Sequence, residues 1–124
     1  FNQVGFRATF GHDDLAAAAD WQRANGIARL VRTAAADGAA ALDGDRILRV
    51  PGYRVDVVDV TGAGDTFGAA LVWGLGQGRD FDAALSFAVA AASRAVTRHG
   101  PRGGRAGVDE IEAWRDARQQ TPPV

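Results

Sequence analysis

The chain has 124 residues, of which 47% are apolar and 23% charged, and it contains no cysteine. This composition is typical of a globular protein and excludes disordered, fibrous and disulfide-framed classes. Because 14 basic residues nearly balance 15 acidic ones, we expect no nucleic-acid partner. The length is that of one ordinary domain, so we expect one domain over residues 1–124. No apolar run reaches membrane-spanning length and no secretory leader is recognisable, so we expect no membrane contact, and the lack of cysteine fits a cytoplasmic location.

The first predicted elements are a helix and a strand. Asp13 can cap a helix over residues 14–25, and Gly26 can end it. Residues 27–33 carry apolar side chains in imperfect alternation, which predicts a strand.

Two further short strands are predicted at residues 38–42 and 46–50, on either side of Asp43-Gly44-Asp45. An Asp-Gly pair between apolar runs favours a hairpin, because glycine adopts the positive φ that tight turns require. The sequence therefore predicts an α/β fold in which a sheet with flanking helices carries an inserted β-hairpin.

A strand, a glycine loop and a helix follow in close succession. Residues 55–58 contain three valines and predict a strand, residues 61–64 predict a loop, and a helix is expected from Asp65 to about Leu75.

Two more helices are predicted toward the end of the chain. The first covers residues 82–98, with Asp80 as its cap and a narrow face of small residues suited to close packing. A loop over residues 100–107 precedes the second, for which Asp109 and Glu112 have the spacing of a capping box.

The loop that runs into the helix at Asp65 carries the chemistry. Backbone amides of Gly62, Ala63 and Gly64 can point at one spot and form an anion hole at the positive end of the helix dipole. A carboxylate at Asp65 would repel a phosphate there, so it is better explained as a general base that accepts the proton of an attacking hydroxyl. Taken alone, the same residues also fit an ordinary turn with Asp65 as a helix cap.

Residues 59–67 read Asp-Val-Thr-Gly-Ala-Gly-Asp-Thr-Phe, and this run resembles the signature of the ribokinase-like, or PfkB, family of carbohydrate and nucleoside kinases. Residues 49–55 and 95–100 also resemble the segments that flank the signature in that family. The resemblance implies a ribokinase-like fold and ATP-dependent phosphorylation of a sugar or sugar-like alcohol, with ATP and Mg²⁺ as cofactors and K⁺ as a further candidate.

The resemblance also implies roles for single residues. Asp65 would be the catalytic base and the backbone of Gly62 to Gly64 the anion hole, while a monovalent cation would lie near Asp59 and Thr61. The remaining implied residues are Thr33, Ala35, Gly38 and Val89 at the nucleotide, and Asn2 in connection with Mg²⁺.

Three departures from the family pattern qualify these roles. Ala35 stands where relatives usually have glycine, and Gly5 stands where they have a glutamate three residues after the asparagine. Family members are more than twice as long, so the chain resembles only their C-terminal, ATP-side half. Two hypotheses follow. The first is a sugar kinase that needs a missing N-terminal half or a homo-oligomeric partner. The second is a non-catalytic module that binds a nucleotide or another anion, or a degenerate structural relative of the kinases.

Overall fold

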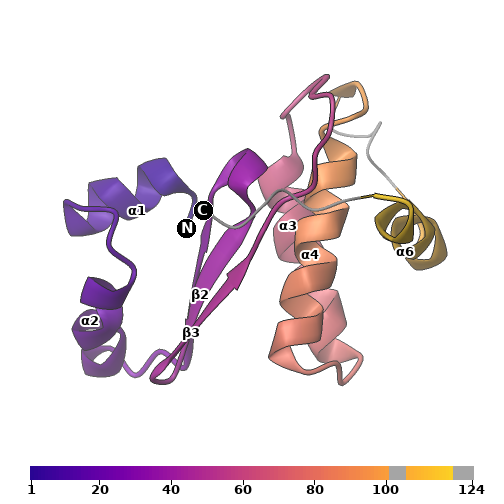
Figure 1. The fold of residues 1–124 in the computed structure, drawn as a ribbon. Coiled ribbons are helices and arrows are strands. Elements are labelled where there is room, and N and C mark those ends of the chain that lie inside the picture. The colour runs from indigo at the N-terminus through magenta and orange to yellow at the C-terminus, as the bar shows by residue number, and fades with distance from the viewer. Residues whose placement is uncertain (101–105, 119–124) are drawn as a thin grey trace.

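The computed structural model describes residues 1–100 and 106–118 (Figure 1). The helices and strands, in chain order, are α1 (Gln3–Phe10), the 3₁₀ turn η1 (Ala16–Ala18), α2 (Ala19–Ala24), β1 (Arg29–Thr33), the 3₁₀ turn η2 (Ala35–Asp37), β2 (Ala39–Asp43), β3 (Arg46–Val50), α3 (Ala63–Gly76), α4 (Phe81–Ala95) and α6 (Val108–Asp116). Within the described ranges, no helix is both long and apolar enough to cross a membrane.

The sheet of the described residues has three antiparallel strands in the order β1-β2-β3. The predicted hairpin is confirmed, because Leu42 pairs with Ile47 and Asp43 pairs with Arg46 around a tight turn. Gly44 supplies the positive φ of that turn, at 60°. β1 extends the hairpin on the side of β2, so β2 is the central strand.

The sheet lies between two layers of helices, α1 and α2 on one face and α3 and α4 on the other (Figure 1). Side chains of a strand alternate between faces, so Ala40 and Leu42 of β2 join Phe6 in one core while Ala39 and Ala41 join the other. These four residues of β2 are all buried. The predicted α/β fold with flanking helices is therefore confirmed.

The helices α3 and α4 pack closely through small residues. A Cβ added to Gly74 of α3 would lie 3.1 Å from the Cβ of Ala84 in α4, so glycine permits this approach. Asp80 caps α4 as predicted, because its Oδ1 accepts a hydrogen bond of 2.8 Å from the amide of Ala83.

The N-terminal region differs from the prediction in two places. Residues 14–25 form a 3₁₀ turn followed by a short α-helix, and Asp14 rather than Asp13 accepts hydrogen bonds at its start. Asp13 instead pairs with Arg7. The helix α1 was not predicted, and its start is fixed by Asn2, whose side chain accepts a hydrogen bond from the amide of Gly5.

The strand predicted at residues 55–58 is wrong. Pro51 and Gly52 end β3, after which the amides of Val58 and Asp59 both donate to the carbonyl oxygen of Val96, at 2.7 and 3.1 Å. The amide of Val58, at the end of this segment, thus binds the end of α4 instead of a neighbouring strand.

The capping box predicted at the last helix is also wrong. Gly107 is the N-cap of α6, and Asp109 lies inside its first turn. Glu112 forms an ion pair of 3.2 Å with Arg79 instead of capping. Most of the loop predicted at residues 100–107 lies outside the described residues.

Candidate phosphate-binding and catalytic site

The glycine loop enters α3 through a left-handed residue. Gly62 is the N-cap, with φ of 81° and ψ of 1°, a conformation that a β-carbon disfavours. Asp65 is the third residue of α3 and its side chain is exposed. The predicted order of loop, helix and first-turn carboxylate is therefore confirmed, with the helix beginning two residues earlier than expected.

The amides available to an anion differ slightly from the predicted set. The amide of Ala63 already donates to the carbonyl of Val60, at 3.2 Å. Within the described part of the chain, the amides of Gly62, Gly64 and Asp65 have no hydrogen-bond partner. A Cβ placed on Gly64 would meet nothing within 4 Å among the described residues, so the main chain at Gly64 has open space beside it. Free amides at a helix N-terminus can donate to an anion, and here the free amides include that of Asp65 in place of Ala63.

Asp59 connects the loop to the far end of α4. Its Oδ1 accepts from the amide of Thr61 at 2.9 Å, and its Oδ2 accepts from the amide of Gly100 at 2.8 Å. Hydrogen bonds from the hydroxyl and amide of Thr61, and from the amide of Gly100, hold the pKa of this carboxyl at about 2. The carboxylate therefore orients the loop, a connection that sequence reasoning missed because it spans 41 positions.

The residues predicted around a nucleotide fall into two groups. Thr33 ends β1, Ala35 begins the turn η2, and Gly38 directly follows that turn. Ala35 has φ of 48° and Gly38 has φ of 95°. Val89, by contrast, is 2% exposed within the core of α4, so its side chain is not presented at the surface of this chain.

Ala35 has a conformation that glycine adopts more readily. Among the described residues it is the one non-glycine with positive φ, and such a conformation costs about 1–2 kcal/mol for an L-residue. The sequence departure at this position is thus accommodated by backbone strain, and the turn keeps a glycine-like geometry.

Asn2 lies close to the same turn through its backbone. It forms a parallel bridge with Thr33, while its side-chain Oδ1 accepts from the amide of Gly5 at 2.7 Å. The local environment of Asn2 is that of a helix cap. The described residues contain no group of three His, Cys, Asp or Glu side chains that could hold a metal ion.

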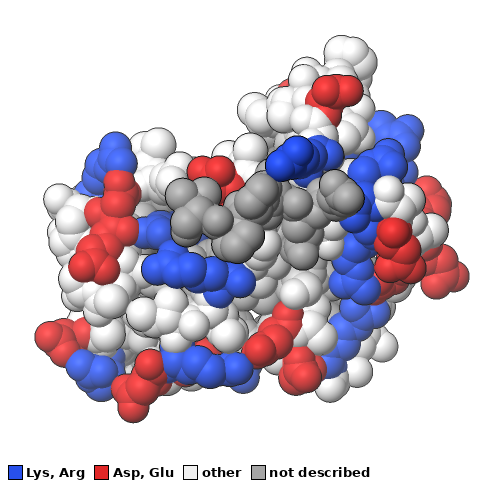
Figure 2. Space-filling model, viewed as in Figure 1, with Lys and Arg blue, Asp and Glu red and all other residues white. Residues whose placement is uncertain are grey.

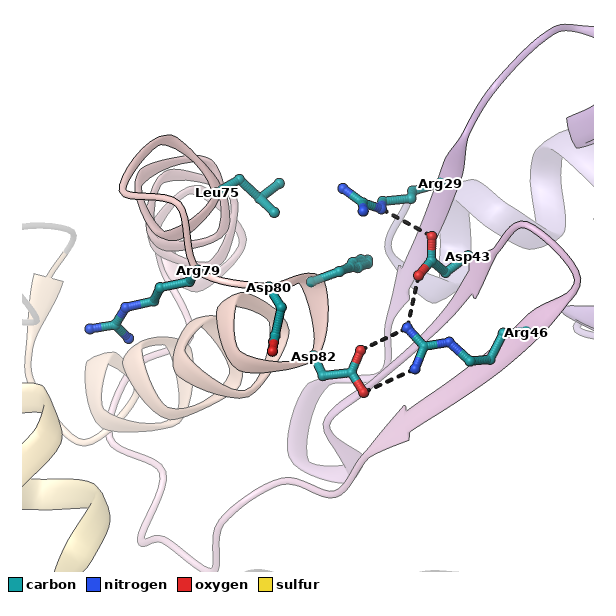
Figure 3. A pocket seen from close by; sticks show the side chains of 8 residues that line it. Arg29, Asp43, Arg46, Leu75, Arg79, Asp80 and Asp82 are labelled. Atoms are coloured by element: carbon teal, nitrogen blue, oxygen red, sulfur yellow. Dashed lines mark hydrogen bonds and ion pairs between the residues drawn. The ribbon is translucent and has the colours of Figure 1, made fainter.

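A polar cavity of about 560 Å³ lies at the opposite end of the sheet (Figure 3). Arg46 reaches across it, binding Asp43 of β2 at 2.9 Å and Asp82 of α4 at 2.8 Å. Arg29 binds the other oxygen of Asp43 at 3.1 Å. None of the predicted site residues lines this cavity. Along the lower edge of the molecule in Figure 2, acidic and basic side chains alternate. The ion pairs of Arg46 join the hairpin to α4.

Comparisons with known proteins support a kinase relationship. The model of the pfkB family carbohydrate kinases matches residues 2–105. Ribokinase of Bacillus subtilis is 41% identical over 85 residues, which cover 68% of this chain and 29% of the relative. The 5-dehydro-2-deoxygluconokinase of the same organism is 32% identical over 71 residues, covering 57% of this chain and 22% of the relative.

A solved structure shows a similar fold. A putative ribokinase II from E. coli in complex with ATP and Mg²⁺ matches with a TM-score of 0.85 and 30% identity, over 93% of this chain and 37% of that one. The chain therefore spans between a fifth and two fifths of the length of these relatives.

Proposed function

Because the chain belongs to the pfkB family of carbohydrate kinases, we propose that it forms the nucleotide side of an ATP-dependent phosphotransferase acting on a sugar or sugar-like alcohol. One observation carries this proposal: the amides of Gly62, Gly64 and Asp65, which have no hydrogen-bond partner among the described residues, lie at the start of α3, where the Asp65 carboxylate is exposed. An anion hole and a proton acceptor are the two groups that phosphoryl transfer to a hydroxyl requires.

In the proposed reaction, the Asp65 carboxylate accepts the proton of the acceptor hydroxyl as its oxygen bonds to the γ-phosphorus. The bond from that phosphorus to the bridging oxygen breaks, and ADP leaves with the electron pair. The three amides donate to phosphate oxygens on which charge develops, and the dipole of α3 adds to their effect.

The cofactors fit this chain to different extents. Mg²⁺ bound with ATP neutralises phosphate charge, and it commonly keeps several waters and phosphate ligands, so few protein ligands are needed. Asn2 remains a candidate for an indirect contact with it. A monovalent cation such as K⁺ near Asp59 and Thr61 also remains a prediction, although both oxygens of Asp59 already accept hydrogen bonds.

The acceptor is proposed only as a class. The names of the relatives, among them ribokinase and 5-dehydro-2-deoxygluconokinase, indicate different substrates. Because the chain matches a small share of each, we propose that residues outside these 124, from a further portion of the kinase or from a partner copy, contact the sugar. A cytoplasmic location is proposed with this function.

The test compares Asp65→Asn with Asp109→Asn, which changes an exposed aspartate in the first turn of α6. ADP formation with a panel of sugars, and ATP affinity, are measured in the kinase that carries this chain. Asp65→Asn should lower kcat about 10²–10⁴-fold while ATP affinity holds, because an amide accepts no proton. Asp109→Asn should change neither. Unchanged kcat in Asp65→Asn contradicts the base, and ATP binding without turnover in the wild type indicates a binding module instead.

A further inference from the structure

The two parts of the candidate nucleotide site are joined by a short segment, Pro51 to Tyr53, that follows β3. On one side of this segment lies the turn of residues 35–38, which we call the base-side turn. On the other side, residues 55–60 lead to the glycine loop. Gly52 lies between the two.

Gly52 and Gly38 bring two backbones into direct contact. A Cβ on Gly52 would lie 2.2 Å from the carbonyl oxygen of Ala36, and a Cβ on Gly38 would lie 2.0 Å from the carbonyl oxygen of Val50. The obstructing atoms are backbone atoms in both cases, so no flexible side chain could move aside. Each glycine thus allows the opposite backbone to approach.

The base-side turn is held in a strained conformation. The amide of Ala34 donates to the carbonyl of Gly38 at 2.8 Å, which closes the turn around Ala35 with its positive φ. A strained residue persists when its surroundings over-determine it. The contact with Gly52 supplies that constraint from outside the turn.

The chain beyond Gly52 is anchored as well. Tyr53 is 7% exposed, and its ring centroid lies 5.4 Å from that of Trp114. Farther on, Val58 and Asp59 bind the carbonyl of Val96. A segment fixed at Tyr53 and again at Val58 leaves little freedom for Gly52 to shift.

From these contacts we propose that Gly52 is a positioning residue that sets the base-side turn relative to the phosphate-binding loop. This inference rests on the proposed function, since it assumes that one nucleotide contacts both parts. ATP needs the correct spacing between them, whereas tripolyphosphate needs only the amides of Gly62, Gly64 and Asp65. A displaced base-side turn therefore lowers the affinity for ATP but not the affinity for tripolyphosphate.

The experiment measures dissociation constants of ATP and of tripolyphosphate, both with Mg²⁺, by calorimetry on the kinase that carries this chain. Gly52→Ala introduces the overlap with Ala36, and Pro51→Gly loosens the same segment without adding an atom. Gly76→Ala is the control, since a Cβ there meets nothing within 4 Å. Thermal melts followed by circular dichroism report on folding.

We expect Gly52→Ala to weaken ATP binding about tenfold, which corresponds to a loss of about 1.4 kcal/mol of contacts with the displaced turn, and to leave tripolyphosphate affinity nearly unchanged. Pro51→Gly should lower the affinity for ATP by a smaller factor, and Gly76→Ala should change the affinity for neither ligand. If Gly52→Ala does not fold, Pro51→Gly decides. An equal loss of both ligands, or no loss of ATP affinity in a folded variant, overturns the positioning role. A wild-type chain that binds tripolyphosphate but not ATP overturns it too, and one that binds neither overturns the proposed function itself.

Discussion

The two ends of the sheet are held by different kinds of interaction. At the hairpin end, the exposed side chain of Arg46 in β3 binds the partly buried Asp43 of β2 and the exposed Asp82 of α4 (Figure 3). At the other end, where the base-side turn lies, backbone contacts backbone at Gly38 and Gly52. Side chains at a surface can move and be replaced by water, whereas a backbone contact leaves no such freedom. Sensitivity to substitution should therefore be concentrated at the end that carries the candidate site.

The largest effect is expected for Gly38→Ala. The added methyl would overlap the carbonyl of Val50, and the φ of 95° already disfavours an L-residue, so we expect a loss of roughly 3 kcal/mol or more in the free energy of unfolding. Gly44→Ala in the hairpin turn is the matched control, because its φ is 60° and the space around it is open. It should cost only about 1–2 kcal/mol in urea titrations. Equal losses would show that the backbone contact is unimportant.

Asp59 should make stability depend on pH. Its pKa in the folded chain is about 2, below the ordinary 3.8, so its contribution is complete above about pH 4 and is lost as the pH falls toward 2. Urea titrations from pH 5 to 2 should show wild type and Asp59→Asn converging across this window. Asp56→Asn removes the same charge from the same segment without touching Gly100 and is the control. A constant gap between wild type and Asp59→Asn would contradict the role of the carboxylate.

Ala35→Gly should stabilise the chain slightly. Relief of the left-handed strain gains about 1–2 kcal/mol, and the greater freedom of glycine in the unfolded chain offsets about 0.4–1 kcal/mol. The net gain in the free energy of unfolding should be about 1 kcal/mol or less. Ala36→Gly lies in the same turn without a positive φ and should instead destabilise. A loss in both variants would mean that Ala35 is unstrained.

The smallest effect is expected for Arg46→Ala at the hairpin end. The side chains of Arg46 and Asp82 are 53% and 54% exposed, so water and salt screen their attraction. The difference in unfolding midpoint from wild type should be below that of Ala35→Gly and should shrink further as NaCl is raised to 1 M. A large, salt-independent loss would mean that both ends of the sheet are held equally firmly.

The sequence predicted elements whose signals are local. The hairpin follows from Asp43-Gly44, the cap of α4 from Asp80, and the start of α3 from the glycine loop, because each is decided within a few residues. The strand expected at residues 55–58 failed for the opposite reason. Valines favour a strand only where a neighbouring strand exists, and here the backbone binds Val96 instead.

The candidate site was predictable to the same extent. The loop and Asp65 could be found from residue types alone, whereas Ala35 stood out only through the resemblance to the family, whose members usually have glycine there. The bond from Asp59 to Gly100 and the contact of Gly52 with Ala36 could not, since both join segments far apart in sequence. The burial of Val89 was also hidden, because helix periodicity does not say which apolar face meets the core and which meets a ligand.

The central place of β2 makes it a reporter of global opening. Ala40 and Leu42 belong to the core beneath α1, and Ala39 and Ala41 belong to the core beneath α4. Exposing the strand requires both helical layers to separate at once, so its amide protons should exchange with deuterium only when the whole chain opens. Amides of residues 55–60 should exchange far sooner. The ratio of the two exchange rates would measure how independently the segment before the candidate site opens locally.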